Sequence, residues 1–164
     1  MFKNSEDFLK DFLNCVDEND GLRVFKSGAV RESIKGKGRC DLLPLDIVIN
    51  VKEDKPLNLI HNFKVSGDVE HLIDLLKLEM DEDIYNVLLD VSHRFGLGAI
   101  KYGDHNWQKG IPANVYIDSG TRHYLKYMRG DDDEDHRAAY IWNIMCCIWT
   151  CEHLPELNIY AKIA

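Results

Sequence analysis

Apolar residues recur along most of the chain at steps of three and four, the spacing that places them on one face of a helix. The pattern predicts helices over residues 6–16, 69–80, 81–102, 116–129 and 134–152. The last of these is apolar almost all round. A helix of that character is central to its bundle or buried in an oligomer.

Two shorter apolar runs, residues 45–51 and 57–65, are too brief for periodicity to separate helix from strand. The second lies between Pro56 and the break at Ser66 and Gly67, and it fits a strand. We therefore expect a mainly α fold, a helical bundle that includes a small β element in the 45–67 region.

The length of 164 residues suits one domain, so we treat 1–164 as a single unit. Residues 1–44 are expected to form an N-terminal helix followed by an irregular arm. Residues 45–80 form a variable or inserted region, and 81–152 form the helical core that carries the chemistry.

Charge and cysteine usage narrow the class of protein. Twenty basic against 28 acidic residues, a net charge of −8, argue against binding a nucleic-acid polymer or an anionic membrane. The five cysteines contain no CxxC pair, which is typical of a reduced intracellular protein. No apolar run reaches the ~18–20 residues of a membrane span. We expect a soluble, cytoplasmic protein.

The arm over residues 23–39 is basic in a chain that is otherwise acidic. Its basic residues and glycines are Arg23, Lys26, Gly28, Arg31, Lys35, Gly36, Lys37, Gly38 and Arg39. Glycines let backbone N–H groups approach an anion, and basic side chains can hold it. The alternative is a flexible, solvated arm.

Five consecutive carboxylates, residues 131–135, precede His136 and the apolar last helix. Acids at a helix start cap it and complement its macrodipole. Carboxylates followed by an imidazole are also ligands for a divalent ion. Asn143 lies with His136 on the only polar line of this helix, and an unpaired buried amide costs about 1–3 kcal/mol. Its partner is either structural or a ligand.

Further candidates lie on the preceding elements. In the loop over 103–110, Trp107 is a plausible platform for a flat base, with Asn106 and Lys109 beside it, or else it closes the edge of the core. Asp118 and Arg122 share one helix face, and His123 follows.

Asp90 and Lys101 belong to another stripe, in which acids and bases share one face of the predicted helix over 81–102. Surface ion pairs are the ordinary explanation for such a stripe. The alternative is that the two residues belong to a site.

Taken in order, several segments resemble the phage-type dATP/dGTP diphosphohydrolase family. They are FKSGAVR at 25–31, GKGRCDLLP at 36–44, GAIKYGDHNWQKG at 98–110, and Arg122-His123, Gly130 and residues 133–143. The resemblance implies a relationship to the all-α, MazG-like nucleoside triphosphate pyrophosphohydrolases. These use Mg²⁺ or Mn²⁺ to release pyrophosphate from a (d)NTP, leaving the monophosphate.

The resemblance also implies a site. The expected metal ligands are Asp90, Glu134, Asp135 and His136. The expected catalytic residues are Lys101, Asp118 and His123. The expected substrate-binding residues are Arg39, Asn106, Trp107, Lys109, Arg122 and Asn143.

The chain departs from the family pattern in its carboxylates. The ExxE of MazG-like enzymes is present at Glu79 and Glu82, but no ExxD follows, and Asp90 stands where the family has glutamate. We expect a purine nucleotide as partner and a homo-oligomer, dimer or tetramer. Two alternatives remain: an inactive protein that binds or sequesters nucleotide, and a phage accessory protein that acts through a host partner.

Overall fold

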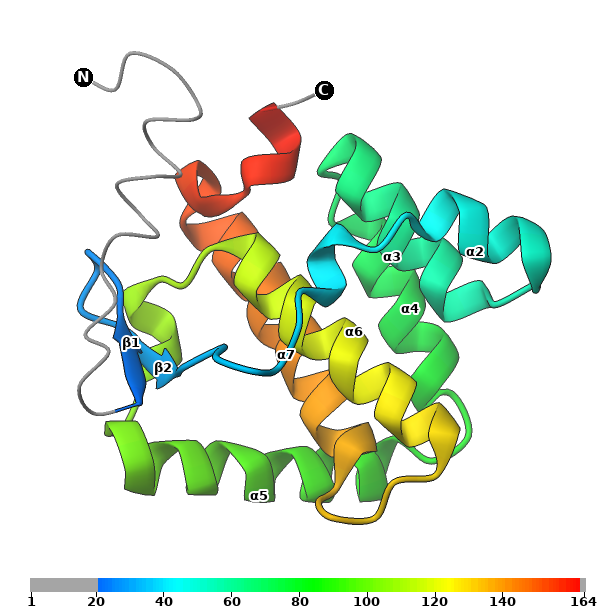
Figure 1. Cartoon of the computed structure of the whole chain (residues 1–164). Helices are drawn as coiled ribbons and strands as arrows, with labels where there is room; N and C mark the ends of the chain where they lie inside the picture. Colours follow the sequence, from blue (N-terminus) through cyan, green and yellow to red (C-terminus); the bar gives the residue numbers. More distant parts are fainter. Residues whose placement is uncertain (1–20, 163–164) are drawn as a thin grey trace.

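The computed structural model describes residues 21–162 and is mainly helical (Figure 1). The predicted helix over residues 6–16 lies outside the described part. The helices and strands are β1 (Leu22–Val24), β2 (Val30–Glu32), α2 (Leu45–Val51), α3 (Lys55–Ser66), α4 (Glu70–Met80), α5 (Ile84–Tyr102), α6 (Ala113–Arg129) and α7 (His136–His153). Short 3-10 helices are η2 (Cys40–Leu42), η3 (Asn106–Lys109), η4 (Pro155–Leu157) and η5 (Ile159–Lys162).

The four long helices predicted after residue 69 are confirmed, with ends shifted by a few residues. No helix within residues 21–162 is both long and apolar enough to cross a membrane.

The basic arm folds into an antiparallel hairpin. β1 pairs with β2 in a register that sets Leu22 opposite Glu32 and Arg23 opposite Arg31. Gly28 adopts a φ of 81° in the turn, a left-handed conformation that favours glycine. This part of the arm is therefore ordered, and its side chains have fixed positions.

The prediction of a β element in the 45–67 region is wrong, because both apolar runs there are helical. Asp54 caps α3 by accepting a hydrogen bond from the Leu57 backbone N–H at 2.9 Å. Leu57, Ile60 and Phe63 are buried at a spacing of three, which is a helix face. Gly67 ends the helix in the left-handed conformation. Capping by Asp54 thus favours a helix in a run for which periodicity alone did not separate helix from strand.

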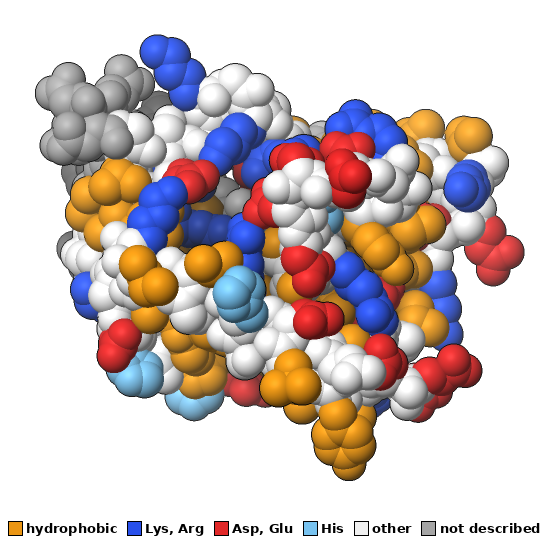
Figure 2. All heavy atoms as spheres, turned by 90° about the horizontal axis from the view of Figure 1, so that it is seen from below, with side chains coloured by type: hydrophobic (Ala, Val, Ile, Leu, Met, Phe, Trp, Pro, Cys, Tyr) orange, Lys and Arg blue, Asp and Glu red, His pale blue; other side chains and the backbone are white. Residues whose placement is uncertain are grey.

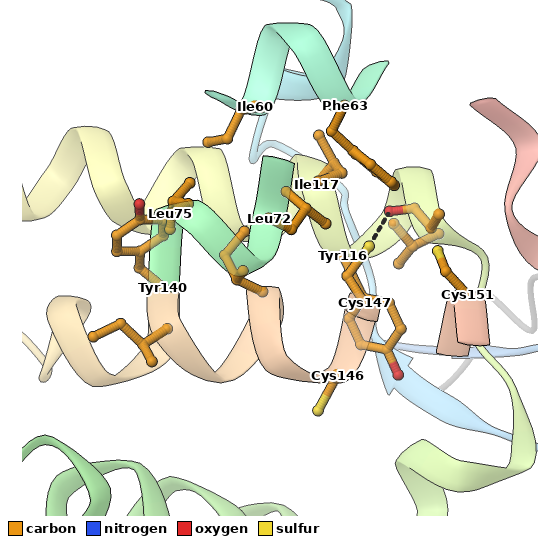
Figure 3. Packing of buried hydrophobic residues seen from close by; sticks show 14 of the residues in the cluster. Ile60, Phe63, Leu72, Leu75, Tyr116, Ile117, Tyr140, Cys146, Cys147 and Cys151 are labelled. Carbon is orange, nitrogen blue, oxygen red and sulfur yellow. Dashed lines mark hydrogen bonds between the residues drawn. The ribbon is translucent and has the colours of Figure 1, made fainter. Parts of the chain in front are cut away.

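α7 is the central helix of the bundle, which explains its apolar surface. It packs most extensively against α6 and also contacts α4 and α5 (Figure 1). The close approach of α6 depends on Gly120, where a Cβ would lie 3.3 Å from the Asn143 Cβ. Figure 3 shows Leu72, Ile117 and Tyr140 of three helices meeting in the core. One chain covers α7, so its apolar surface does not require an oligomer.

α5 crosses one end of the bundle and covers it with only one face (Figure 1). Val87 and Val91 point into the core. The opposite face is apolar but exposed: Tyr85 is 82% exposed, Leu89 67% and Ile100 87%. Exposed large apolar side chains are thus found on α5 and on shorter elements such as α2, but not on α7.

Candidate active site

A cavity of about 1100 Å³ lies between the hairpin, the C-terminal half of α5, the loop before η3, and α6. The view of Figure 2 faces α5 and shows a recess in which Lys and Arg side chains gather. The elements around it are far apart in the sequence, from Arg23 to Trp142, so the fold creates the cavity.

The lining of this cavity is strongly basic. Its basic side chains are Arg23, Arg31, Lys37, Arg94, Lys101, Arg122 and Lys126, and its carboxylates are Glu32, Asp104 and Glu134. Seven cations against three anions contrast with a chain whose net charge is −8. A cleft lined by one sign of charge concentrates ligands of the opposite sign. The cavity therefore suits a polyanion.

Arg31 forms part of the cavity wall and is held by aromatic rings. Its guanidinium lies 5.3 Å from the Tyr116 ring centroid and 5.4 Å from that of Trp142. Its Nη2 donates to Asn143 Oδ1 at 2.9 Å, while Nη1 is buried without a hydrogen-bond partner. Burial lowers the pKa of Arg31. This cation forms no ion pair with any carboxylate in the described chain.

Asn143 has the structural partner that its burial requires. Its Oδ1 accepts from Arg31, and its Nδ2 donates to the Ala139 carbonyl at 2.8 Å. The amide therefore positions Arg31, and Asn143 does not itself line the cavity.

Two imidazoles and a carboxylate meet beside the cavity, where α6 faces the start of α7. His123 Nδ1 lies 2.9 Å from His136 Nδ1, and Glu134 Oε1 lies 3.8 Å from the first and 3.7 Å from the second. Burial lowers the pKa of His123 to about 4, which keeps this imidazole neutral at pH 7. Neutral imidazoles and a carboxylate are metal donors.

Neighbouring groups hold this cluster. His136 is 2% exposed, and its Nε2 lies 2.8 Å from Asp133 Oδ1. Glu134 Oε2 pairs with Arg94 Nη1 at 2.7 Å, which leaves Oε1 toward the imidazoles. Such outer partners fix the orientation and tautomer of metal ligands.

The donor set fits a divalent ion. The three facing atoms of His123, Glu134 and His136 lie within 4.8 Å of one another. A second group in the described chain, Asp131, Asp133 and His136, shares one imidazole but includes the exposed Asp133. The first group is the better candidate because Glu134 and His123 also line the cavity.

The five carboxylates at 131–135 divide between the two expected roles, helix capping and a metal site. Asp135 caps α7, accepting from the Ala138 N–H at 2.8 Å. Asp131 pairs with Arg129 at 2.5 Å, and Asp133 with Lys126 at 3.4 Å. Only Glu134 of this run lines the cavity. Helix capping and a site are therefore compatible within the same five residues.

Asp118 and Arg122 tie the segment after β2 to α6. Asp118 Oδ1 accepts from the Cys40 N–H at 2.6 Å, and Oδ2 pairs with Arg122. Arg122 Nε donates to the Lys37 carbonyl at 3.1 Å. The glycine-rich segment is thus fixed beside the cavity.

Lys101 joins α5 to the hairpin at the edge of the cavity. It pairs with Glu32, which also pairs with Lys37 at 2.8 Å. Hydrogen bonds from Lys101 and then Lys37 lower the pKa of Glu32 to about 2. Both lysines are thereby held at the lining.

Residues 70–158 match the family model described as dATP/dGTP diphosphohydrolase, N-terminal. The match covers more than half of the chain's 164 residues. The chain belongs to this family. The matched segment includes α5, α6 and α7 and hence the His123, Glu134 and His136 cluster. Searches of curated proteins and of solved structures gave no match.

Two residues of the loop that the family match covers act differently from one another. Asn106 bonds the backbone of Val30 through both ends of its amide, at 2.9 Å and 2.8 Å, so it fastens the loop to β2. Trp107 lines the cavity and packs against Phe95 and Trp149, with centroids 5.4 Å and 5.0 Å apart. Both readings of Trp107 from the sequence are compatible with this position.

Other expected site residues lie apart from the cavity. Asp90 is exposed on α5, because Val87 and Val91 occupy the face that points inward. Arg39 pairs with Asp41 at 2.6 Å, and Lys109 is exposed outside the lining. Within the described chain, these side chains are not brought to the His123 cluster.

Three cavity residues, Arg94, Lys126 and Glu32, were not expected from the sequence to belong to the site. Arg94 lies in the same charged stripe as Asp90 and Lys101, for which surface ion pairs are the ordinary explanation, and Glu32 directly follows the basic motif at 25–31. Nothing in local sequence separates such residues from ordinary surface charges. Arg31 stood in the basic arm, which was a usable signal for an anion site.

Proposed function

We propose that this member of the dATP/dGTP diphosphohydrolase family hydrolyses a purine (d)NTP to the (d)NMP and pyrophosphate in the cytoplasm, the host's if the chain is phage-encoded. The observation that carries the proposal is the strongly basic cavity in an acidic chain, with the His123, Glu134 and His136 donors at its edge. A nucleoside triphosphate is a polyanion with a flat base, and the cavity offers cations and aromatic side chains together.

In this proposal the cations bind the triphosphate and hold it still. Arg94 and Lys126 line the cavity with Glu134 and His123, so they suit the phosphate chain. Arg122 and Lys101 are held by carboxylates, which fixes their positions before substrate binds. Positioning and electrostatics carry most of the catalysis of phosphoryl transfer.

The aromatic part of the lining is proposed to receive the base. Trp107, Phe95 and Trp142 line the cavity, and Phe95 lies edge-on or tilted to both tryptophans. A purine gains about 1–3 kcal/mol from stacking on an aromatic side chain. Asn106 would support this pocket indirectly, by holding the loop against Val30.

A divalent ion, Mg²⁺ or Mn²⁺ in the expectation from the family, would be held by His123, Glu134 and His136. When bound, it would supply neutralisation of phosphate charge and a bound water of lowered pKa. The chain's own contribution is to keep these donors oriented through Asp133 and Arg94.

The direct test is pyrophosphate release from a panel of dNTPs and NTPs with Mg²⁺ or Mn²⁺. We expect release from purine dNTPs, and its loss in Glu134→Gln. Asp132→Asn is the matched control, because Asp132 is an exposed carboxylate of the same run. Absence of turnover with every nucleotide and both ions would refute the proposal.

A protein that binds nucleotide without hydrolysing it is the second candidate. Of the three carboxylates that line the cavity, Glu32 is paired with two lysines and Glu134 with Arg94. Few groups are left to act as a general base. Calorimetric binding of a dNTP with no product after long incubation would favour this candidate.

We also propose that the chain forms a homo-oligomer through the exposed face of α5. Antiparallel pairing of two copies about residue 93 sets Tyr85 opposite Ile100 and Leu89 opposite Leu97, all of which are exposed. Acids at 81–83 precede the helix and Lys101 lies in its last turn, so the ends are complementary in charge. Such a self-complementary contact is typical of a twofold dimer.

A further inference from the structure

The contact between His123 and His136 requires a definite arrangement of protons. Two Nδ1 atoms 2.9 Å apart form a hydrogen bond only if one of them carries the proton. His136 Nε2 faces the Asp133 carboxylate at 2.8 Å and donates a hydrogen bond to it. The other ring nitrogen of His136, Nδ1, faces His123 Nδ1 and Glu134 Oε1.

The proton in the hydrogen bond between the two Nδ1 atoms must leave that bond before a metal ion can bind there. The Nδ1 atoms of both rings and Glu134 Oε1 border one gap. The three donors therefore border one position that an ion can occupy once the proton between the two nitrogens has left it.

The space between the three donors has the size of a transition-metal ion. Their separations are 2.9, 3.7 and 3.8 Å, and a triangle with these sides has its equidistant point about 2.0 Å from each atom. Bonds from first-row metals to imidazole nitrogen and carboxylate oxygen are about 2.0–2.2 Å.

The kind of donor distinguishes between ions of this size. Mg²⁺ prefers oxygen ligands in an octahedron and keeps several waters, so two imidazoles suit it poorly. Imidazole is a common ligand of zinc, iron and nickel, and affinity for mixed nitrogen and oxygen sites rises along the first-row series. The donor set therefore favours a transition metal.

We propose that His123, Glu134 and His136 bind a first-row transition-metal ion in preference to Mg²⁺, with Asp133 and Arg94 as positioning residues. Asp133 fixes the His136 tautomer, and Arg94 turns Glu134 so that Oε1 faces the imidazoles. The importance of the ion for catalysis rests on the proposed function, but its binding can be measured separately.

The experiment uses the full chain after treatment with a chelator. Co²⁺ is titrated while its visible absorption is recorded, and the melting temperature is measured with Mn²⁺, Co²⁺, Zn²⁺ or Mg²⁺. We expect a Co²⁺ spectrum of a site with nitrogen ligands, and saturation by transition ions at concentrations roughly tenfold or more below Mg²⁺. Equal or tighter binding of Mg²⁺ would overturn the proposal.

Substitutions of the proposed ligands and of Asp133 test where the ion binds. His123→Ala and Glu134→Gln should lose the Co²⁺ spectrum, and both can be checked for folding by circular dichroism. Asp133→Asn should weaken Co²⁺ binding about 10–100-fold while keeping the spectrum, as expected of an outer partner. Asp132→Asn should match the wild type. A wild-type spectrum in His123→Ala, or equal affinities in Asp133→Asn and Asp132→Asn, would contradict the assignment.

Parallel assays separate this inference from the proposed function. Binding of Co²⁺ without any pyrophosphate release would refute the proposed function but support the metal site. Pyrophosphate release supported by Mg²⁺, with no transition-metal binding, would refute the transition-metal site and support the proposed function.

Discussion

Arg23 and Arg31 stand directly opposite each other on the two strands of the hairpin, and both side chains line the cavity. Like charges in opposite positions destabilise a strand pair. Burial and then the charge of Arg31 lower the pKa of Arg23 to about 10. Within residues 21–162, neither arginine forms an ion pair with a carboxylate. A bound polyanion would relieve this repulsion.

Arg23→Gln should therefore change binding much more than stability. We expect the unfolding free energy of the ligand-free protein to change by less than about 1 kcal/mol, because the substitution removes the repulsion but also the hydrogen bond from Arg23 Nε to the Glu32 carbonyl. Triphosphate binding should weaken roughly tenfold or more, because a cation beside the anion is lost. Urea unfolding and calorimetry with a dNTP measure the two effects. Lys35→Gln, an exposed change on the same arm, should alter neither.

Glu32 gives a prediction about pH. Its pKa in the folded protein is about 2, below its ordinary value of 4.5, so its pairing with Lys101 and Lys37 stabilises the fold above pH 4.5. The contribution is lost as pH falls from about 4.5 to about 2. Because the side chain is 50% exposed, we expect less than about 1 kcal/mol.

Glu32→Gln should be less stable than the wild type at pH 7 and equal to it near pH 2. Urea unfolding of both proteins over this range measures the difference. A gap that persists unchanged in acid would show that the carboxylate charge is not its cause.

Asp118 is predicted to act through the segment after β2. Asp118→Ala removes the acceptor of the Cys40 N–H and the partner of Arg122, and its side chain is only 4% exposed. We expect a loss of about 2–3 kcal/mol in unfolding free energy, since bonds to a buried charge are strong. Faster hydrogen exchange at the Cys40 amide should accompany it. Asp46→Ala, an exposed acid on α2, should leave that exchange rate unchanged.

The exposed face of α5 predicts an oligomer that a surface charge can break. Leu89→Lys places a charge in the proposed contact without touching the core, because Leu89 is 67% exposed. We expect light scattering to give a multimer for the wild type and a monomer for the variant, with equal circular dichroism. A monomeric wild type at high micromolar concentration would rule out this contact.

The sequence by itself determined the four long helices after residue 69 and the burial of the last one, either at the centre of the bundle or in an oligomer. Periodicity, capping residues and glycine stops act within a few residues, so they can be read locally. It also pointed to Glu134, His136 and the basic arm, because their residue types are unusual for their positions. The run over 57–65 was misread because capping by Asp54 lay just outside it.

Only the tertiary structure decided which candidates meet. Arg31 and Asn143 are 112 positions apart in the chain, and Asn106 contacts Val30 over 76, distances that no local pattern encodes. Asp90 and Glu134 both looked like ligands, but the packing of Val87 and Val91 turns Asp90 to solvent, while the α6–α7 contact brings Glu134 beside His123. Side-chain direction follows from which face a helix buries, and that is fixed only when the helices pack.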